Sequence, residues 1–138
     1  VFATPIYFHH TTASCKRILD RFRSFIHVQI TETGLIHTPH QSWNKKFILL
    51  TALGSSSVED ANPLRDLFGF IQETLGEQNT FESLIGTRLA VRGQISYSRE
   101  QLVDLYPKLG LPERLADEDA ERNRDLLDNA KLLGKNCS

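Results

Sequence analysis

The sequence begins with VFATPIYF (residues 1–8), which is followed by HHTT (9–12) and ASCKRILDRFRSFI (13–26). The first segment is apolar, is too short for a helix and contains a proline, which is typical of a short strand. In the third segment, apolar residues recur at positions 15, 18, 19, 22, 25 and 26, the spacing of one helix face. The sequence therefore predicts a strand, a loop and a helix. The loop lies at the carboxyl end of the strand, where open α/β sheets bind their ligands.

Two more apolar runs are predicted to be strands. Residues 46–53 (KFILLTAL) form a continuous apolar run, as expected for a strand that is covered on both faces. Residues 88–95 (RLAVRGQI) form a third run. Residues 27–44, with Gly34, Pro39 and several Thr and His residues, are expected to be irregular. We expect the three strands to be parallel and adjacent, in the order of the sequence.

Helical periodicity recurs after the second and third runs. One helix is predicted to begin at Asn62, with Pro63 at its first position, and to end at Gly76. A Ser-x-x-Gln capping box predicts a helix near 98–106, and a last helix is predicted over about 117–133. Alternating strands and helices predict an α/β fold with a parallel sheet and right-handed crossovers. The first two crossover helices should cover one face of the sheet, and the last helix the other.

The composition is that of a single ordinary domain and excludes several functional classes. The 138 residues include 16 Lys and Arg and 17 Asp and Glu, which are interspersed and give a net charge of −1. Without a basic stripe, we expect neither nucleic acid nor an anionic membrane as a partner. No apolar run approaches the ~20 residues of a membrane helix, and no secretory signal is visible. Two cysteines make no disulfide framework, so a cytoplasmic location is expected.

The sequence contains no methionine and begins within a predicted strand. We therefore expect the chain to be the later part of a longer polypeptide. As an edge strand, residues 1–8 would be bare and apolar, which natural proteins avoid. The strand missing from that edge is expected to precede Val1.

The opening residues resemble a motif of the NAD(P)H-dependent FMN reductases and multimeric flavodoxin-type quinone reductases. In that family a strand ends in Thr/Ser-Pro-x-Tyr-Phe or a close relative, a small hydroxyl residue opens the helix, and a Lys…Asp-Arg pattern lies along the helix. The resemblance covers roughly the first twenty residues, and the later segments support it by element order. The matching positions are Thr4, Pro5, Tyr7, Phe8, Thr12, Lys16, Asp20 and Arg21.

The resemblance implies a flavodoxin-like three-layer α/β/α sandwich with a parallel sheet. Residues 1–138 would be its carboxyl-terminal part, from strand three to the final helix, without the first strand and the phosphate loop. Because those parts contribute to cofactor binding and to the core, we expect the 138 residues alone to bind FMN weakly. We also expect them not to persist as a well-behaved monomer.

The resemblance implies an FMN-dependent oxidoreductase that takes hydride from NAD(P)H and reduces a quinone, a flavin or a similar small-molecule acceptor. It also implies a homodimer or homotetramer. The flavin carries the redox chemistry in such enzymes, so no catalytic residue of the protein is predicted. Two alternatives stay open: a flavodoxin-type electron-transfer module, and a non-catalytic flavodoxin-like domain that has lost FMN.

The resemblance places FMN against the loops 4–12 and 51–56, which contact it through backbone groups more than side chains. Two other interpretations stay open, because Tyr7 and Phe8 could be core residues that cap the sheet, and the serine-rich turn could be a solvated connector. The predicted cofactor-binding residues are Thr4, Pro5, Ile6, Tyr7, Phe8, Thr12, Thr51, Ala52, Leu53, Gly54 and Ser55.

The remaining chemistry-bearing residues suggest no further site. The histidines at 9, 10, 37 and 40 lack cysteine or acidic partners at metal-ligand spacing, so no metal is predicted. Cys15 and Cys137 cannot hold the iron–sulfur cluster of some relatives, and Cys15 is expected to be a packed thiol. Lys16 and Asp20 are expected to form an i,i+4 ion pair, on a helix face that is either solvated or part of a subunit interface.

Overall fold

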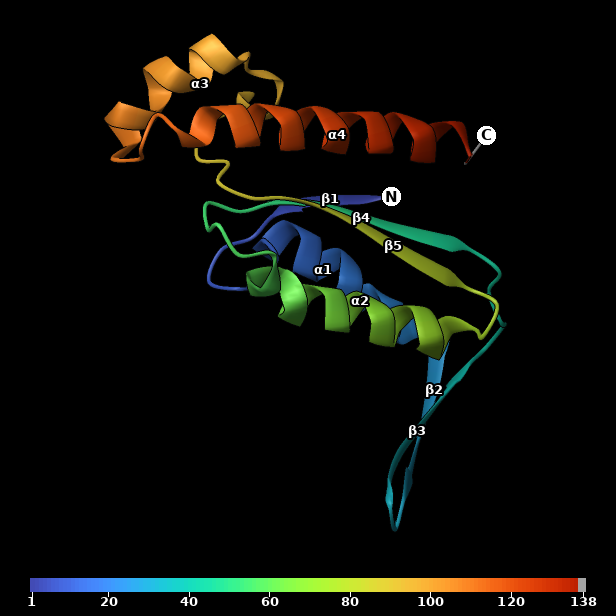
Figure 1. Ribbon diagram of the computed structural model, residues 1–138. Coiled ribbons are helices and arrows are strands. Elements are labelled where there is room, and N and C mark those ends of the chain that lie inside the picture. The colour runs from blue at the N-terminus through green and yellow to red at the C-terminus, as the bar shows by residue number, and fades with distance from the viewer. Residues whose placement is uncertain (137–138) are drawn as a thin grey trace.

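A three-stranded parallel sheet forms the centre of the structure (Figure 1). The computed structural model describes residues 1–136. The strands, in their spatial order, are β1 (Phe2–Pro5), β4 (Lys46–Ala52) and β5 (Thr80–Gly86). The α/β class and the parallel pairing agree with the sequence prediction, as do the positions of the first two strands.

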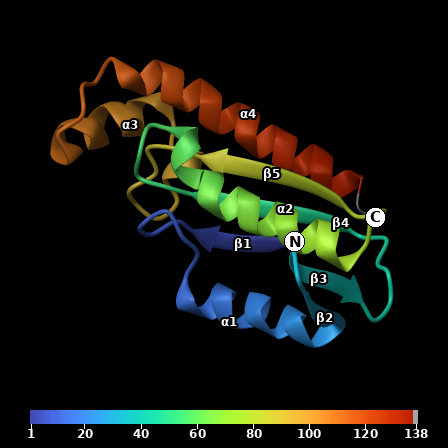
Figure 2. The same ribbon diagram turned by 90° about the horizontal axis from the view of Figure 1, so that it is seen from below.

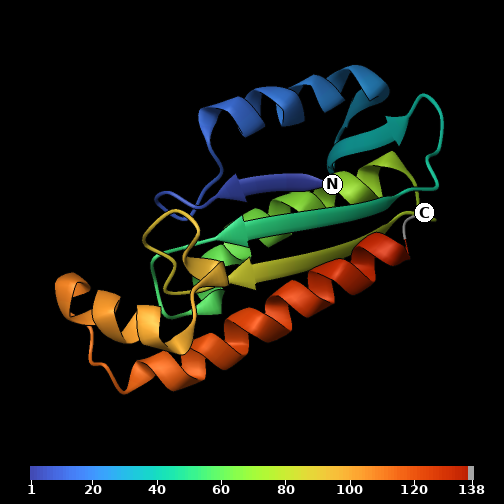
Figure 3. The ribbon, with the colours of Figure 1, turned by 90° about the horizontal axis from the view of Figure 1, so that it is seen from above.

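Helices cover both faces of this sheet, as predicted. Figures 1 and 2 show α1 (Ala13–Arg21) and α2 (Asn62–Leu75) on one face and α4 (Leu115–Lys135) on the other. Seen from above in Figure 3, α4 runs along β5 and leaves the β1 side of that face uncovered. The sheet is therefore fully covered on one face and half covered on the other.

The central strand β4 is buried on both faces, as its continuous apolar run predicts. Phe47, Ile48 and Leu49 are at most 5% exposed. Leu49 joins a core with residues of α1 and α2, among them Cys15 and Phe68. At about 25 cal/mol per Å² of apolar surface, this burial supplies the main driving force for the fold.

The prediction of an irregular segment at 27–44 is wrong. After a 3₁₀ turn, η1 (Phe22–Phe25), the chain forms an antiparallel hairpin of β2 (Ile26–Thr31) and β3 (Gly34–Pro39). The alternation of Ile26, Val28 and Ile30 was a strand signal. Ile26 also continues the helical spacing of the preceding segment, so the sequence pattern at this point fits either a helix or a strand.

The prediction of a third strand at 88–95 is also wrong, because β5 begins eight residues earlier in the chain. The turn after α2 is short and is held by Asn79, whose side chain donates to the carbonyl oxygen of Gln72 (2.9 Å) and accepts from the amide of Lys45 (2.7 Å). This turn places Thr80 opposite Lys46 and starts the pairing there. Residues 88–95 form a loop that ends in a 3₁₀ turn, η3 (Gln94–Ser96).

The carboxyl-terminal helices follow the predicted order. The helix α3 (Arg99–Leu105) begins at Ser98 with the predicted capping box, in which Gln101 is the reciprocal partner. A 3₁₀ turn, η4 (Tyr106–Leu109), leads to α4, which is longer than predicted at both ends. Leu102, Tyr106 and Ala116 form a second small core between α3 and α4.

Gly76, which ends α2 as predicted, gives a first test of the fold. Its φ is +153°, and a Cβ atom there would lie 2.5 Å from the carbonyl oxygen of Trp43. We expect Gly76→Ala to lower the free energy of unfolding by about 1–3 kcal/mol, because neither backbone segment can move freely. Gly69→Ala in the same helix meets nothing within 4 Å and should be neutral or stabilising. Urea unfolding of both variants measures the difference, and equal stabilities would contradict this account of the turn.

Candidate functional site

The carboxyl ends of the three strands lie side by side and carry three loops (Figure 3). Backbone hydrogen bonds join the loops: Ile6 donates to Ala52 (2.9 Å), Leu53 donates to Gly86 (2.9 Å) and Arg88 donates to Ser55 (2.9 Å). The two predicted ligand loops, 4–12 and 51–56, are therefore brought together, as parallel strands require. The third loop follows β5 and includes residues 88–95, which the sequence pattern predicts to be a strand.

The loop after β1 contains a strained turn. Tyr7 and His10 exchange two backbone hydrogen bonds of 3.0 Å, so that Phe8 and His9 form the corner. Their φ angles are +49° and +62°, in the left-handed region that residues with side chains rarely adopt. Such backbone costs about 1–3 kcal/mol per residue and is concentrated at functional sites.

The two aromatic side chains of this loop face solvent. Tyr7 is 63% exposed and Phe8 is fully exposed, so the alternative that both are core residues is wrong. Burying a Phe side chain stabilises a fold by about 1.5–3 kcal/mol, and the exposed Phe8 ring does not contribute this stabilisation. The turn therefore presents a flat apolar ring at the carboxyl edge of the sheet.

A group of threonines, of which Thr4 and Thr51 are buried, holds the loops together. The Thr4 hydroxyl lies 3.1 Å from the Thr11 hydroxyl and accepts a hydrogen bond from the Thr12 amide (3.3 Å). Thr51 donates its hydroxyl to the Thr4 carbonyl oxygen (2.6 Å), and the Thr12 hydroxyl caps α1 by accepting from the Cys15 amide (3.3 Å). These hydroxyls bond to the protein and fix the positions of the loops.

The predicted site residues therefore divide into two groups. The side chains of Thr4, Thr51 and Leu53 are buried, so these residues support the loops from within. The residues that are at least partly exposed at the sheet edge are Pro5, Ile6, Tyr7, Phe8, Thr12, Ala52, Gly54 and Ser55.

Backbone donors also lie free at this edge. Within residues 1–136, the amides of Phe8, His9, Gly54, Ser55 and Ser56 donate to no other protein group. A Cβ atom built on Gly54 would meet nothing within 4 Å, so the space beside this backbone is open. The edge therefore carries an exposed aromatic ring and several free amide donors, the kinds of group that suit a planar heterocycle with carbonyl oxygens.

An apolar cavity of about 460 Å³ adjoins the same strand ends. It lies between the upper face of the sheet and α4, on the side where the helix leaves β1 uncovered. Its walls include Ala3, Pro5, Leu50, Leu84 and Leu126. Because this space is apolar and lies on one face of the sheet, it extends the site without supplying polar recognition.

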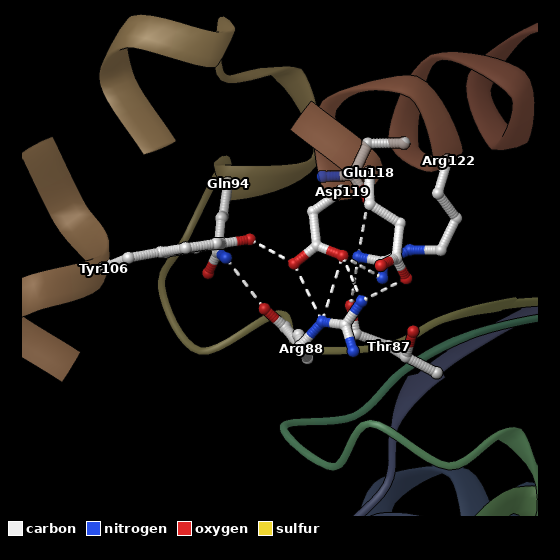
Figure 4. Close-up of polar contacts among 8 residues, drawn as sticks. Thr87, Arg88, Gln94, Tyr106, Glu118, Asp119 and Arg122 are labelled. Carbon is white, nitrogen blue, oxygen red and sulfur yellow. Dashed lines mark hydrogen bonds and ion pairs between the residues drawn. The ribbon is translucent and has the colours of Figure 1, made fainter. Parts of the chain in front are cut away.

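The third loop is fixed by a buried charge cluster that sequence reasoning missed (Figure 4). Asp119 of α4 is fully buried, and its carboxylate accepts from Arg88 Nε at 2.8 and 3.0 Å. Arg122 and the Tyr106 hydroxyl also donate to this carboxylate. Gln94 closes the loop by donating to the Arg88 carbonyl oxygen (2.7 Å) and accepting from the amide of Ala90 (2.8 Å).

The protonation of this cluster follows from burial and hydrogen bonding. Burial of the Asp119 carboxyl favours its neutral form, but the hydrogen bonds from Arg88 and Tyr106 outweigh burial and keep its pKa below the ordinary value. Burial, together with the bond to Asp119, raises the pKa of Tyr106 to about 12. At neutral pH the cluster is therefore an ionised carboxylate held by two guanidinium groups and a neutral phenol.

Removal of the central carboxylate should be costly. We expect Asp119→Asn to lower the free energy of unfolding by about 3–5 kcal/mol, because the charges of Arg88 and Arg122 lose their buried partner. Glu118→Gln is the matched control, since Glu118 contacts the same Arg88 but is 68% exposed, and it should cost less than about 1 kcal/mol.

The same cluster predicts a pH dependence. The pKa of Asp119 is lower in the folded protein than in the unfolded chain. The stabilisation that ionised Asp119 gives to the folded protein is therefore complete above the pKa of Asp in the unfolded chain, about 3.9. It is lost as the pH falls through the lower pKa of Asp119 in the folded protein. Urea unfolding from pH 7 to pH 3 should show the difference between the native protein and Asp119→Asn shrinking with acidification. A constant difference would contradict this assignment.

The histidines and Cys15 have structural contacts within the protein. Among the described residues, no three His, Cys, Asp or Glu side chains are grouped so that they could hold a metal ion. His9 lies on Asp60, 3.2 Å from its carbonyl oxygen. Cys15 is a buried free thiol in the core and Lys16 pairs with Asp20, both as predicted. Cys137 lies outside the described residues.

Across residues 1–136, none of the helices has the length and apolar character needed to cross a membrane. Comparison with known proteins found no matching family model, no matching curated protein and no matching solved structure.

Proposed function

We propose that this chain belongs to a flavodoxin-like FMN-dependent oxidoreductase that is cytoplasmic and uses NAD(P)H to reduce a quinone, a flavin or a similar small acceptor. The observation that carries the proposal is the pair of loops at one sheet edge, with the exposed Phe8 ring on a strained turn after β1 and the free amides of residues 54–56 after β4. The Thr-Pro-x-Tyr-Phe resemblance of residues 4–8 supplies the identity of the cofactor.

The residues at the sheet edge fit the isoalloxazine ring of FMN. Phe8 and Tyr7 provide flat rings that hold a planar heterocycle with little loss of conformational entropy. The free amides around Gly54 and Ser55 suit the carbonyl oxygens of the flavin. The buried threonines keep both loops in place, so the binding groups are organised before the ligand arrives.

The flavin, when bound, supplies the hydride and electron chemistry, and the chain's own residues bind and orient it. Such an enzyme needs an open ring face for its donor and its acceptor. The loops at the strand ends are partly exposed and would give such substrates access to the ring.

Two alternatives make different predictions about the purified protein. A non-catalytic domain that has lost FMN would be colourless and would not bind added flavin. A flavodoxin-type carrier would bind FMN but would not oxidise NADH or NADPH. The net charge of −1 is low for such carriers, which are usually strongly acidic, and this favours the enzyme.

The aromatic residue is the most direct test of the site. We expect Phe8→Ala to weaken FMN binding roughly tenfold, because the variant loses a ring contact of about 1–1.5 kcal/mol. Phe8→Tyr keeps the ring and should bind like the native protein. Phe70→Ala removes a half-exposed ring of α2 away from these loops and serves as the control. Quenching of flavin fluorescence measures the affinities, and an unchanged value for Phe8→Ala would refute the site.

The glycine of the second loop provides an independent test. Gly54 borders open space, so Gly54→Val should be compatible with folding while its branched side chain fills the space beside the free amides. We expect weaker FMN binding with an unchanged melting temperature. Unchanged affinity in the same titration would show that this loop is only a connector.

A further inference from the structure

The hairpin of β2 and β3 extends away from the sheet, past the layer of α1 and α2 (Figure 1). Its register pairs Ile26 with Pro39, Val28 with His37, and Ile30 with Leu35. Because side chains alternate between the faces of a strand, these three pairs share one face of the hairpin. That face is a nearly continuous apolar stripe from the base of the hairpin to its tip.

Only the base of this stripe is covered by the rest of the chain. His37 packs edge-on against the ring of Phe70, with ring centroids 5.4 Å apart, and Ile26 faces the same helices. At the tip, Ile30 is 83% exposed and Leu35 is 59% exposed. A two-stranded hairpin is marginally stable by itself, so a long arm with a bare apolar tip indicates a surface that another molecule covers.

An apolar groove of about 240 Å³ lies at the foot of the same hairpin. It runs between the base of the hairpin and the outer surfaces of α1 and α2, at the end of the sheet opposite the ligand loops. Leu19, Leu67, Phe70 and Ile71 form its walls, and Phe70 is half exposed. The chain therefore carries a protruding apolar tip and an apolar recess next to one another.

We infer that this groove receives the hairpin tip of a second copy of the chain, in a two-fold dimer. Two hairpins that lie antiparallel and face to face place the tip of each at the foot of the other. Each strand has six residues, about 20 Å in length, so one such contact spans the part of each stripe that the chain itself leaves bare. A two-fold pair covers both tips and both grooves at once, because each copy supplies the same two surfaces.

The charges of the two surfaces agree with this pairing. Glu32 at the tip is the only carboxylate of the hairpin sequence. At the rim of the groove Lys16 and Asp20 neutralise each other, whereas Arg23 keeps its positive charge while it donates to the Ile26 carbonyl oxygen (2.8 Å). The tip is therefore acidic where the groove is basic, and such complementarity selects the partner and its register.

Sedimentation analysis of the purified protein over a range of concentrations tests the dimer. Replacing Ile30 by Asp and Leu35 by Lys keeps a favourable cross-strand pair within the hairpin. The double variant should raise the dimer dissociation constant at least about thirtyfold, because two buried apolar contacts are lost. Both side chains are exposed within one copy, so circular dichroism should show unchanged melting of the monomer. Val58→Asp, at a half-exposed residue of η2 (Val58–Ala61) away from the hairpin, is the control and should leave the dimer intact.

A charge reversal tests the pairing itself. Glu32→Arg alone and Arg23→Glu alone should each weaken the dimer, and the double variant should restore it. A monomeric native protein at all concentrations, or an oligomer that the tip variants do not change, would overturn the inference. Weakening by both single reversals without rescue in the double variant would also overturn it, because the two residues would then not face each other. The result does not depend on FMN, so it is independent of the proposed function.

Discussion

The structure depends on β4, which pairs with a strand on each side and is buried on both faces. Its backbone groups can be satisfied only by parallel neighbours, and its apolar side chains only by helices on both sides of the sheet. With β1 and β5 in register beside it, the carboxyl ends of all three strands meet at one edge. The ligand loops are therefore neighbours because of strand pairing, although 47 residues separate Thr4 from Thr51, which it contacts.

The two buried polar groups at this edge hold different loops. The threonine hydroxyls are neutral and join the loops after β1 and β4 at a modest energetic cost. The loop after β5 is held by the carboxylate of Asp119, whose desolvation is offset by two arginines and a tyrosine. Rigid support of this kind allows the outermost residue, Phe8, to stay exposed on a strained turn. The free energy gained from the packed sheet and the bonded loops offsets the strain of this turn.

The proposed binding edge and the hairpin groove lie at opposite ends of the molecule (Figure 1). The loops follow the carboxyl ends of the strands, whereas the hairpin begins where α1 returns to the other end of the sheet. A dimer formed through the hairpins would therefore leave the strand ends open. The two apolar surfaces also differ in kind, since one is a single exposed ring at an edge that also carries amide donors, and the other is a stripe with a recess at its foot.

The amino-acid sequence alone determined the α/β class, the strands β1 and β4, the helix after Asn62 and the capping box at Ser98. Each of these rests on a local pattern of apolar spacing or on a side chain that bonds to nearby backbone. Sequence reasoning also found the two loops around Phe8 and Gly54, because parallel strands bring their carboxyl ends together. The last strand could not be placed in this way, since residues 80–86 and 88–95 are both apolar enough to pair.

Tertiary contacts decided what the local patterns left open. Asn79 bonds to Gln72 and Lys45 and thereby starts β5 at Thr80, and Arg88 is held in a loop by Asp119, 31 residues further along the chain. The exposure of Phe8 was likewise undetermined, because an apolar ring is expected inside a protein. Only the packed sheet decides whether that ring has a core to enter. Long-range bonds and burial belong to the folded chain as a whole, so no window of sequence contains them.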